Sequence, residues 1–291
     1  MKRIAIISLV VLGICVWSWG QDKPAAQNPP AGQAAGQGAS QTAAPQGKRP
    51  PKINSQEEYA AYQAAVKVAD AGECEKAAND FAAKYPASEV RTIVYRAAML
   101  RYQQANNEAK AVEIAKKVLA IDPDDPEALV AVALADVDQA KDDSLDKDER
   151  LAAAKKGAER SLVTVETDVP TTGYPEEQLK NYKNFIRSQA YFVIGMAAYK
   201  TSQWPEAEAN LRKSIDALPQ SPDVVTIYHL ALSLDFQNKI PEALKAAQQA
   251  VELTKDSPDS PAGKAARQEQ DRLMKYSTTG TSGQAGTPPK N

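Results

Sequence analysis

The chain has 291 residues, of which 43% are hydrophobic, which is enough to form a sizeable core. Its formal net charge of −2 at pH 7 argues against nucleic acid as a main partner, because phosphate binding needs a basic surface. The single histidine and two cysteines leave few residues from which a catalytic or metal-binding site could be assembled.

Residues 1–20 have the pattern of a secretory signal peptide. Lys2 and Arg3 supply positive charge, an apolar run follows, and the segment ends in the small residue Gly20. We therefore expect cleavage after Gly20 and a periplasmic location, with a net charge of about −4 for the mature chain. Two alternatives stay open: an outer-membrane lipoprotein attached through Cys15, and a chain that keeps this segment as an N-terminal anchor.

Two segments lack a periodic apolar pattern. Residues 21–53 are rich in Ala, Gln, Pro and Gly, and residues 277–291 form a similar stretch at the end of the chain. Such sequences cannot bury enough surface to offset the entropy of ordering, so we predict a disordered linker and a disordered tail. Residues 54–276 remain as the folded domain, and nothing in them is apolar enough to span a bilayer.

Signals for helix starts recur through the folded domain. Ser55 is a good N-cap because Glu58 follows three residues later, which makes a capping box. Proline begins four of the expected helices, where the first helical amide has no partner to lose: Pro126, Pro175, Pro222 and Pro261. No segment shows the period of two that is typical of a strand. We predict helices over 55–70, 73–85, 88–104, 108–121, 126–140, 147–165, 176–201, 205–218, 222–236, 241–254 and 261–276.

The second helix of each expected pair repeats one pattern of small residues. In segment 202–219, Ala207, Leu211 and Ser214 lie on one helical face, and this face is too thin to form a core alone. Related stretches begin at residues 72, 106, 149, 202 and 238, with spacings such as 34 and 36 residues. A period near this length is typical of a helical repeat array, in which each small-residue helix packs between its neighbours.

These repeats resemble the tetratricopeptide repeat, a helix pair with bulky and small residues at set positions. Residues 188–221 carry the pattern as Tyr191, Ile194, Gly195, Ala207, Leu211, Ser214 and Pro219. Residues 92–125 carry it as Tyr95, Ala98, Tyr102, Ala111, Ala115, Val118 and Pro123. Residues 224–255 carry it as Ile227, Leu230, Ala231, Leu234, Ala243, Ala247 and Ala250. Ala198, Met99 and Lys255 depart from it, and residues 58–87 and 126–166 depart further, the latter through an insertion.

The resemblance implies an all-α fold, a right-handed α–α superhelix of about five helix pairs with a C-terminal capping helix. It also implies a binding module whose first helices line a concave face. The candidate partner-binding residues on that face are Arg96, Leu100, Val130, Leu134, Phe192, Met196, Tyr199, Tyr228, Leu232 and Phe236. Two interpretations stay open: these side chains form an apolar groove for a peptide, or a tight superhelix or the loop 163–175 covers them.

Catalytic motifs are not evident. His229 is expected to be structural, and Cys74 is expected to be a buried thiol, with a reactive or intermolecular thiol as the alternative. The acidic stretch 138–149 lacks the glycine and final glutamate of a calcium loop, so we expect a solvated turn. We therefore expect no catalytic residue, metal, cofactor or small-molecule substrate.

The sequence thus favours a non-catalytic interaction or scaffold protein of the bacterial cell envelope that binds a protein or peptide. An accessory of outer-membrane or cell-wall assembly is one alternative. A hydrolase with an unrecognised site is another, and convergence of acidic or histidine groups in a pocket would distinguish it.

The signal pattern predicts Gln21 as the mature N-terminus. N-terminal sequencing of the exported protein should begin at Gln21, because Gly20 ends the apolar run with the small side chain that a signal peptidase accepts. A chain that begins at Met1, or at a lipidated Cys15, would contradict this.

Overall fold

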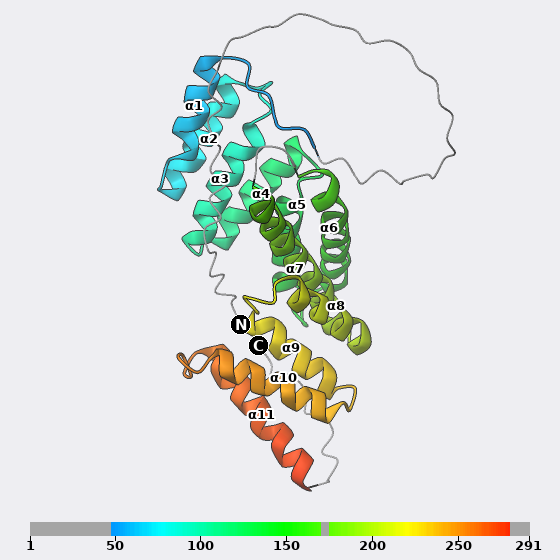
Figure 1. Ribbon diagram of the computed structural model, residues 1–291. Helices are drawn as coiled ribbons and strands as arrows, with labels where there is room; N and C mark the ends of the chain where they lie inside the picture. The colour runs from blue at the N-terminus through cyan, green and yellow to red at the C-terminus, as the bar shows by residue number, and fades with distance from the viewer. Residues whose placement is uncertain (1–47, 170–174, 280–291) are drawn as a thin grey trace, which may run out of the picture.

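The computed structural model describes residues 48–169 and 175–279. The predicted signal peptide, most of the predicted linker, and residues 170–174 and 280–291 lie outside the described residues. The described ranges contain eleven α-helices and no strand, which confirms the predicted all-α class (Figure 1). They are α1 (Gln56–Val66), α2 (Ala71–Lys84), α3 (Arg91–Gln104), α4 (Glu108–Ile121), α5 (Pro126–Gln139), α6 (Lys147–Thr167), α7 (Glu176–Lys200), α8 (Trp204–Ala217), α9 (Val224–Asp235), α10 (Ile240–Leu253) and α11 (Pro261–Thr279).

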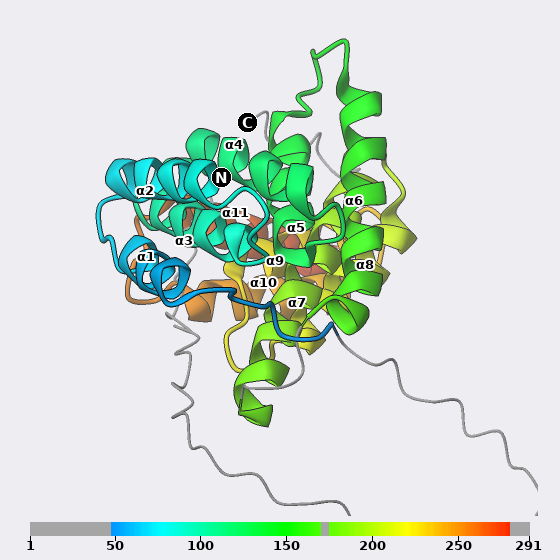
Figure 2. The same ribbon diagram turned by 90° about the horizontal axis from the view of Figure 1, so that it is seen from above.

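The helices form consecutive antiparallel pairs that stack into a solenoid. Each helix packs against the next in the chain from α1 to α11. Several first helices of successive pairs also touch, namely α1 with α3, α5 with α7, α7 with α9 and α9 with α11. Figures 1 and 2 show the pairs in order, with α11 packed on the last pair at the end of the array. None of the described helices is long and apolar enough to cross a membrane.

Local capping sets most helix starts. Ser55 Oγ accepts from the Glu58 amide at 3.0 Å while Glu58 Oε2 accepts from the Asn54 amide at 2.8 Å, which is the predicted capping box. Asp125 caps α5 ahead of Pro126, as the proline pattern predicts. The predicted start of α9 at residue 222 is two residues early, because Asp223 accepts from the Thr226 amide at 3.0 Å and takes the N-cap place.

Three pairs share one tight internal turn. Asn106, Ser202 and Asn238 each adopt a left-handed backbone, with φ of 55°, 60° and 60°. The amide of the following residue then donates to the carbonyl five positions earlier, in the pattern of a Schellman motif. These bonds are Asn107 to Tyr102 at 2.8 Å, Gln203 to Ala198 at 2.9 Å and Lys239 to Leu234 at 2.9 Å. The three pairs are those whose sequences carry the best repeat pattern.

The third and fourth pairs depart from the repeat. A loop separates α5 from α6, which begins at Lys147 as predicted. Helix α7 has 25 residues, and its N-terminal half precedes the repeat-like segment and packs against α5 and α6. Tyr182 Oη donates to Glu127 Oε2 of α5 at 3.1 Å, and Arg187 Nε donates to Glu166 Oε1 of α6 at 2.9 Å.

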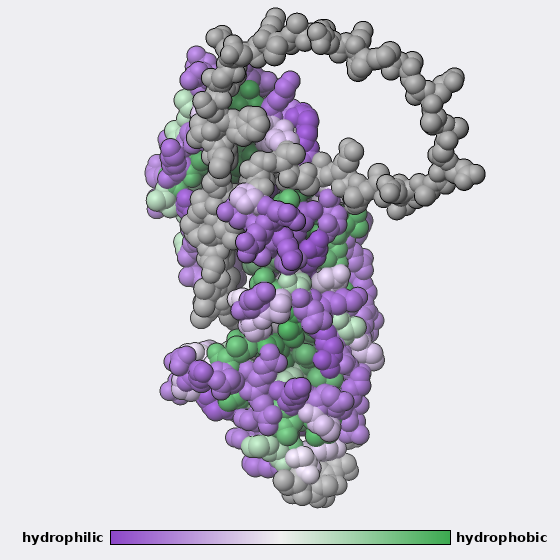
Figure 3. Space-filling view, in the orientation of Figure 1, coloured by the Kyte–Doolittle hydropathy of each residue, from purple (hydrophilic) through white to green (hydrophobic). Residues whose placement is uncertain are grey.

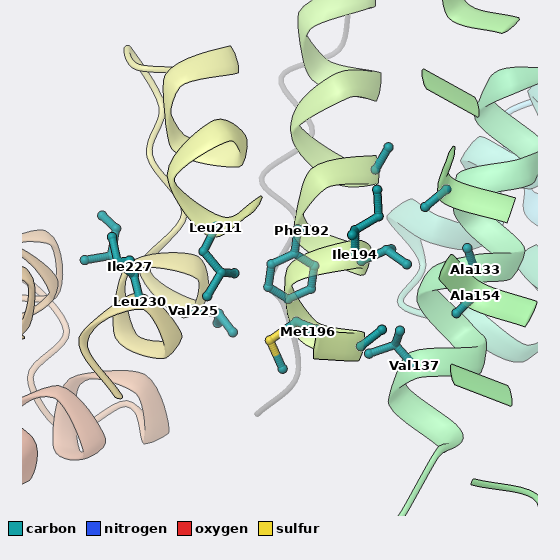
Figure 4. Close-up of a cluster of buried hydrophobic side chains, with 14 of the residues drawn as sticks. Ala133, Val137, Ala154, Phe192, Ile194, Met196, Leu211, Val225, Ile227 and Leu230 are labelled. Atoms are coloured by element: carbon teal, nitrogen blue, oxygen red, sulfur yellow. The ribbon is translucent and has the colours of Figure 1, made fainter. Parts of the chain in front are cut away.

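The buried apolar side chains form two clusters. The N-terminal cluster extends from Tyr62 of α1 to Ala128 at the start of α5. The C-terminal cluster begins at Val130 of α5 and continues to Leu273 of α11, and Figure 4 shows part of it. The two clusters therefore meet within a single helix, α5.

Two predicted boundaries need correction. Residues 48–53, predicted as linker, contact the solenoid: Arg49 pairs with Glu89 at 2.7 Å and Lys48 pairs with Asp122 at 2.6 Å. Helix α11 continues to Thr279, beyond the predicted end at residue 276. The linker composition misleads because it contains few apolar residues, whereas residues 48–53 make ion pairs through Lys48 and Arg49 and one apolar contact through Ile53.

Gly195 and Gly157 offer a matched test of helix packing. A Cβ at position 195 would lie 2.9 Å from Leu211 Cγ and 3.2 Å from the Leu211 backbone nitrogen, whereas at position 157 the nearest atom is Ala133 Cβ at 3.5 Å. Gly195→Ala should lower the free energy of unfolding by about 1–3 kcal/mol through overpacking. Gly157→Ala should raise it by about 0.5–1 kcal/mol, because alanine is the better helix former. Urea unfolding followed by circular dichroism checks both, and equal stability of the two variants would refute the close α7–α8 contact.

Candidate partner-binding surface

The structure buries half of the predicted inner-face residues. Their side chains are exposed by only 3–7%, namely Val130 3%, Phe192 3%, Met196 7%, Tyr228 4% and Leu232 6%. The other five are partly exposed: Arg96, Leu100, Leu134, Tyr199 and Phe236. The prediction of an open groove is therefore wrong for these five residues. At their positions the alternative interpretation applies, in which the stripe is covered.

The cover comes from within the solenoid. Val130, Phe192 and Met196 share one buried cluster with Ile186, which lies on the extended part of α7. Figure 4 shows Phe192 and Met196 within this cluster. Val165 and Val169, from the segment 163–175, are buried in the same cluster. A 25-residue α7 supplies apolar side chains that a helix of ordinary repeat length would lack, so the space inside the third and fourth pairs is filled.

A cluster of aromatic side chains remains partly exposed beside this core. Tyr199 is the next-to-last residue of α7, Trp204 begins α8, and Phe236 follows α9 directly. The Trp204 and Phe236 rings are stacked, with centroids 4.2 Å apart and planes at 15°, and Tyr199 meets Trp204 edge-on at 5.3 Å. We call these three residues the aromatic rim. The left-handed turns at Ser202 and Asn238 bring its members together, because each reverses the chain beside a rim residue.

His229 supports the rim from below. Its ring is buried and lies edge-on to Tyr199 at 5.1 Å and to Tyr228 at 5.4 Å. Its Nδ1 lies 2.8 Å from the Val225 carbonyl oxygen of the same helix. A ring held in this way acts as packing, which agrees with the structural role predicted for His229.

Charged side chains border the rim. Arg272 of α11 pairs with Asp235 of α9 and, at 2.8 Å, with Glu269 one turn earlier. Burial raises the pKa of Asp235 above its usual range, while the Arg272 guanidinium acts in the opposite direction. Burial also raises the pKa of Tyr228 to about 12, and the pKa of Tyr199 is raised for the same reason. Both phenols are therefore neutral at physiological pH.

Figure 3 shows the hydropathy of the surface on one side of the molecule. Most of the visible face is hydrophilic, and hydrophobic residues reach the surface around α9 and α10. On the far side of Trp204, Gln237 Nε2 donates to the Trp204 carbonyl oxygen at 3.3 Å and to Glu208 Oε2 at 3.0 Å. Lys239 pairs with the same Glu208 at 2.6 Å. Polar groups thus adjoin two rim residues: Asp235 precedes Phe236 in the chain, and Gln237 binds the Trp204 carbonyl oxygen.

Arg96 belongs to a separate polar cluster. Its Nη1 lies 3.6 Å from Asp125 Oδ2, and Glu127 nearby accepts the hydrogen bond from Tyr182. Burial raises the pKa of Glu127 and, to a greater extent, that of Tyr182. Acidic groups do converge here, as a hydrolase would require, but a guanidinium and a phenol engage them and no histidine takes part. The cluster connects α3, α5 and α7.

The other residues singled out in the sequence have local roles. Cys74 is buried, its Sγ lies 3.8 Å from the Ala65 carbonyl oxygen, and burial raises its thiol pKa, all of which favours the inert interpretation. In the acidic stretch, Asp142 pairs with Lys147 at 2.8 Å and Asp146 with Arg150 at 2.6 Å, as in a solvated turn. Among the described residues, no group of three or more His, Cys, Asp or Glu is placed to hold a metal ion.

Sequence reasoning missed two surface features. Trp204 was not singled out, although a tryptophan at the first position of a second helix, beside Ser202, marks a side chain at a tight turn. An open apolar groove of about 330 Å³ lies between α1 and α2, lined by Ala61, Val68, Phe81 and other side chains. The sequence pattern does not specify how closely the first two helices pack, so it does not predict this groove.

Comparisons with known proteins add no family to this description. No protein-family model matches the chain, and no curated protein matches it significantly. The features that bear on function are therefore those of the surface and of the repeated turns.

The burial of the inner stripe predicts a sharp division between core and rim. Phe192→Ala and Tyr228→Ala should each lower the free energy of unfolding by about 3–5 kcal/mol, because both rings are buried. Phe236→Ala should lower it by only about 1–2 kcal/mol, since that ring is partly exposed and loses one stacking partner. Thermal and urea melts of the three variants check this, and a wild-type melting temperature for Phe192→Ala would show that the stripe is not core.

Proposed function

We propose that this chain is a tetratricopeptide-type, non-catalytic binding or scaffold protein of the bacterial cell envelope. The observation that carries the proposal is the aromatic rim, which stays partly exposed on a rigid helical array. The partner is a protein or peptide that places apolar or aromatic side chains on the rim. The signal pattern of residues 1–20 supports export and a periplasmic location.

The repeated turns support the tetratricopeptide assignment. The best sequence matches coincide with the three pairs that share a left-handed residue and the same carbonyl acceptor spacing. Similar backbone geometry at similar repeat positions is expected when one structural unit is repeated. The family's usual role in protein recognition is then the natural expectation for this chain.

The physical character of the rim supports a binding role. Aromatic side chains bury much area for few rotatable bonds, and they dominate the energy of many interfaces. The backbone under the rim is fixed by Schellman turns, so little order would be lost on binding. Charged groups next to the rim, around Arg272 and Glu208, match the polar border that surrounds many interface centres.

The polar clusters support a non-catalytic role over the hydrolase alternative. Asp125 and Glu127, the acidic groups that converge near the inner face, are engaged by Arg96 and Tyr182. His229 has its Nδ1 directed at a backbone carbonyl oxygen rather than at a nucleophile. The hydroxyl beside Glu127 is that of Tyr182, and burial raises its pKa, which disfavours its use as a nucleophile.

Affinity capture with rim variants tests the proposal. The full mature chain, with an affinity tag, should capture a defined partner from envelope extracts, and the partner should be identified by mass. Trp204→Ala and Phe236→Ala should each weaken the binding of that partner by about 2 kcal/mol or more, which is about thirtyfold in Kd.

Tyr59→Ala is the matched control, because Tyr59 is also a partly exposed aromatic residue but lies on α1, at the other end of the array. It should leave Kd within about twofold of wild type, as expected for a residue outside the interface. Equal affinities for wild type and both rim variants would exclude the rim as the binding site. If the protein captured no partner but turned over a small molecule, the scaffold function would be excluded.

A further inference from the structure

Residues 48–52, which we call the strap, lie along one edge of the solenoid just before α1. Arg49 and Glu89 form a two-pronged ion pair, with Nη2–Oε1 at 2.7 Å and Nη1–Oε2 at 2.8 Å. The Lys52 amide donates to the same carboxylate at 2.8 Å. Lys48 Nζ lies 2.6 Å from Asp122 Oδ2 and 3.7 Å from Asp168 Oδ1. Figure 1 shows the strap leaving α1 and running along the array.

The acidic partners of the strap occupy equivalent places in the fold. Glu89 lies in the connection from α2 to α3, while Asp122 and Asp168 are the C-cap residues of α4 and α6. Each therefore lies between one helix pair and the next. We call these three residues the acidic ladder. Because it is repeated at successive pairs, a single extended segment can contact all of it.

The strap passes the place where the two apolar clusters meet. The two apolar clusters meet within α5. Helices α3 and α5 touch each other less than the other successive first helices do. A polar pair bridges α3 and α5, namely Arg96 with Asp125 at 3.6 Å. Glu89 and Asp122 lie on the N-terminal side of this place and Asp168 lies on the C-terminal side. The strap therefore reaches across it through Lys48, which lies 2.6 Å from Asp122 and 3.7 Å from Asp168.

We propose that the strap is an electrostatic clamp that limits motion between the N-terminal pairs and the rest of the solenoid. A single exposed ion pair contributes little, since its attraction is screened and its side chains lose entropy. Here several pairs act together on a segment tethered directly to α1, which raises their effective concentration. Pro50 and Pro51 stiffen the segment that joins Lys48 and Arg49 to α1. The segment therefore loses less conformational entropy when it docks.

Limited proteolysis of the full mature chain measures docking of the strap. Trypsin can cut the Lys52–Ile53 bond only when the segment leaves the surface, and the product that begins at Ile53 is quantified by mass spectrometry. Glu89→Gln with Asp122→Asn should speed this cleavage about tenfold at low ionic strength, because exposed ion pairs each shift an equilibrium only a few-fold. Added salt should bring wild type toward the variant rate.

Asp216→Asn with Asp271→Asn is the matched control. It removes the same number of negative charges from exposed positions on α8 and α11, far from the strap in sequence, and should change the rate less than twofold. An unchanged rate in the ladder variant at low ionic strength would overturn docking of the strap.

Hydrogen exchange measures the clamp itself. Lys48→Gln with Arg49→Gln leaves the ladder and its helix caps intact, and should speed amide exchange in α4 and the first turns of α5 several-fold. Exchange in α9 should stay at the wild-type rate. Lys156→Gln with Lys245→Gln, two exposed lysines elsewhere, is the control of equal charge and should resemble wild type. Faster cleavage after Lys52 without faster exchange in α4 and α5 would overturn the clamp.

Discussion

The close approach of paired helices through small side chains is the constraint on which this fold depends. Gly195 packs directly against Leu211, and Ala133 lies in the same buried cluster as Ala154 of the partner helix α6. With so little bulk on each face, no helix pair can bury enough apolar surface alone, and stability must come from stacking one pair on the next. A left-handed residue at the turn lets the second helix reverse direction immediately after the first. The tight turns therefore bring the small-residue faces of the two helices into contact.

The extended α7 changes which side chains this array exposes. In a solenoid of regular repeats, the inner positions of the first helices would form a continuous surface. Here the additional turns of α7 pack against α5 and α6, and the apolar inner residues Val130, Phe192 and Met196 become core. The surface available for aromatic contacts is thereby moved to the end of the first helices, where Tyr199, Trp204 and Phe236 meet. The extended α7 thus buries the inner apolar residues and leaves the aromatic rim as the partly exposed aromatic surface.

The sequence is sufficient to predict the helices but not what covers them. Helix ends depend on local signals such as the capping box at Ser55, and most predicted bounds lie within a few residues of those found. The inner stripe was assigned to the correct helices, but its burial depends on the direction in which the first half of α7 packs, which periodicity does not contain. The strap illustrates the same limit, because Lys48 and Asp122 are 74 residues apart and their pairing leaves no trace in composition. The place of Trp204 in the aromatic rim could not be predicted, because it depends on two turns that bring the ends of three helices together.

The ion pairs of Lys48 also determine where a pulling force would enter the molecule. Lys48 contacts Asp122 and Asp168, near the middle of the array, although it lies just before the first helix in the chain. Tension applied through the N-terminal segment would first load these pairs and then the Arg49–Glu89 pair, and would reach α1 only after both had separated. While they hold, the α1–α2 pair is protected from being peeled away.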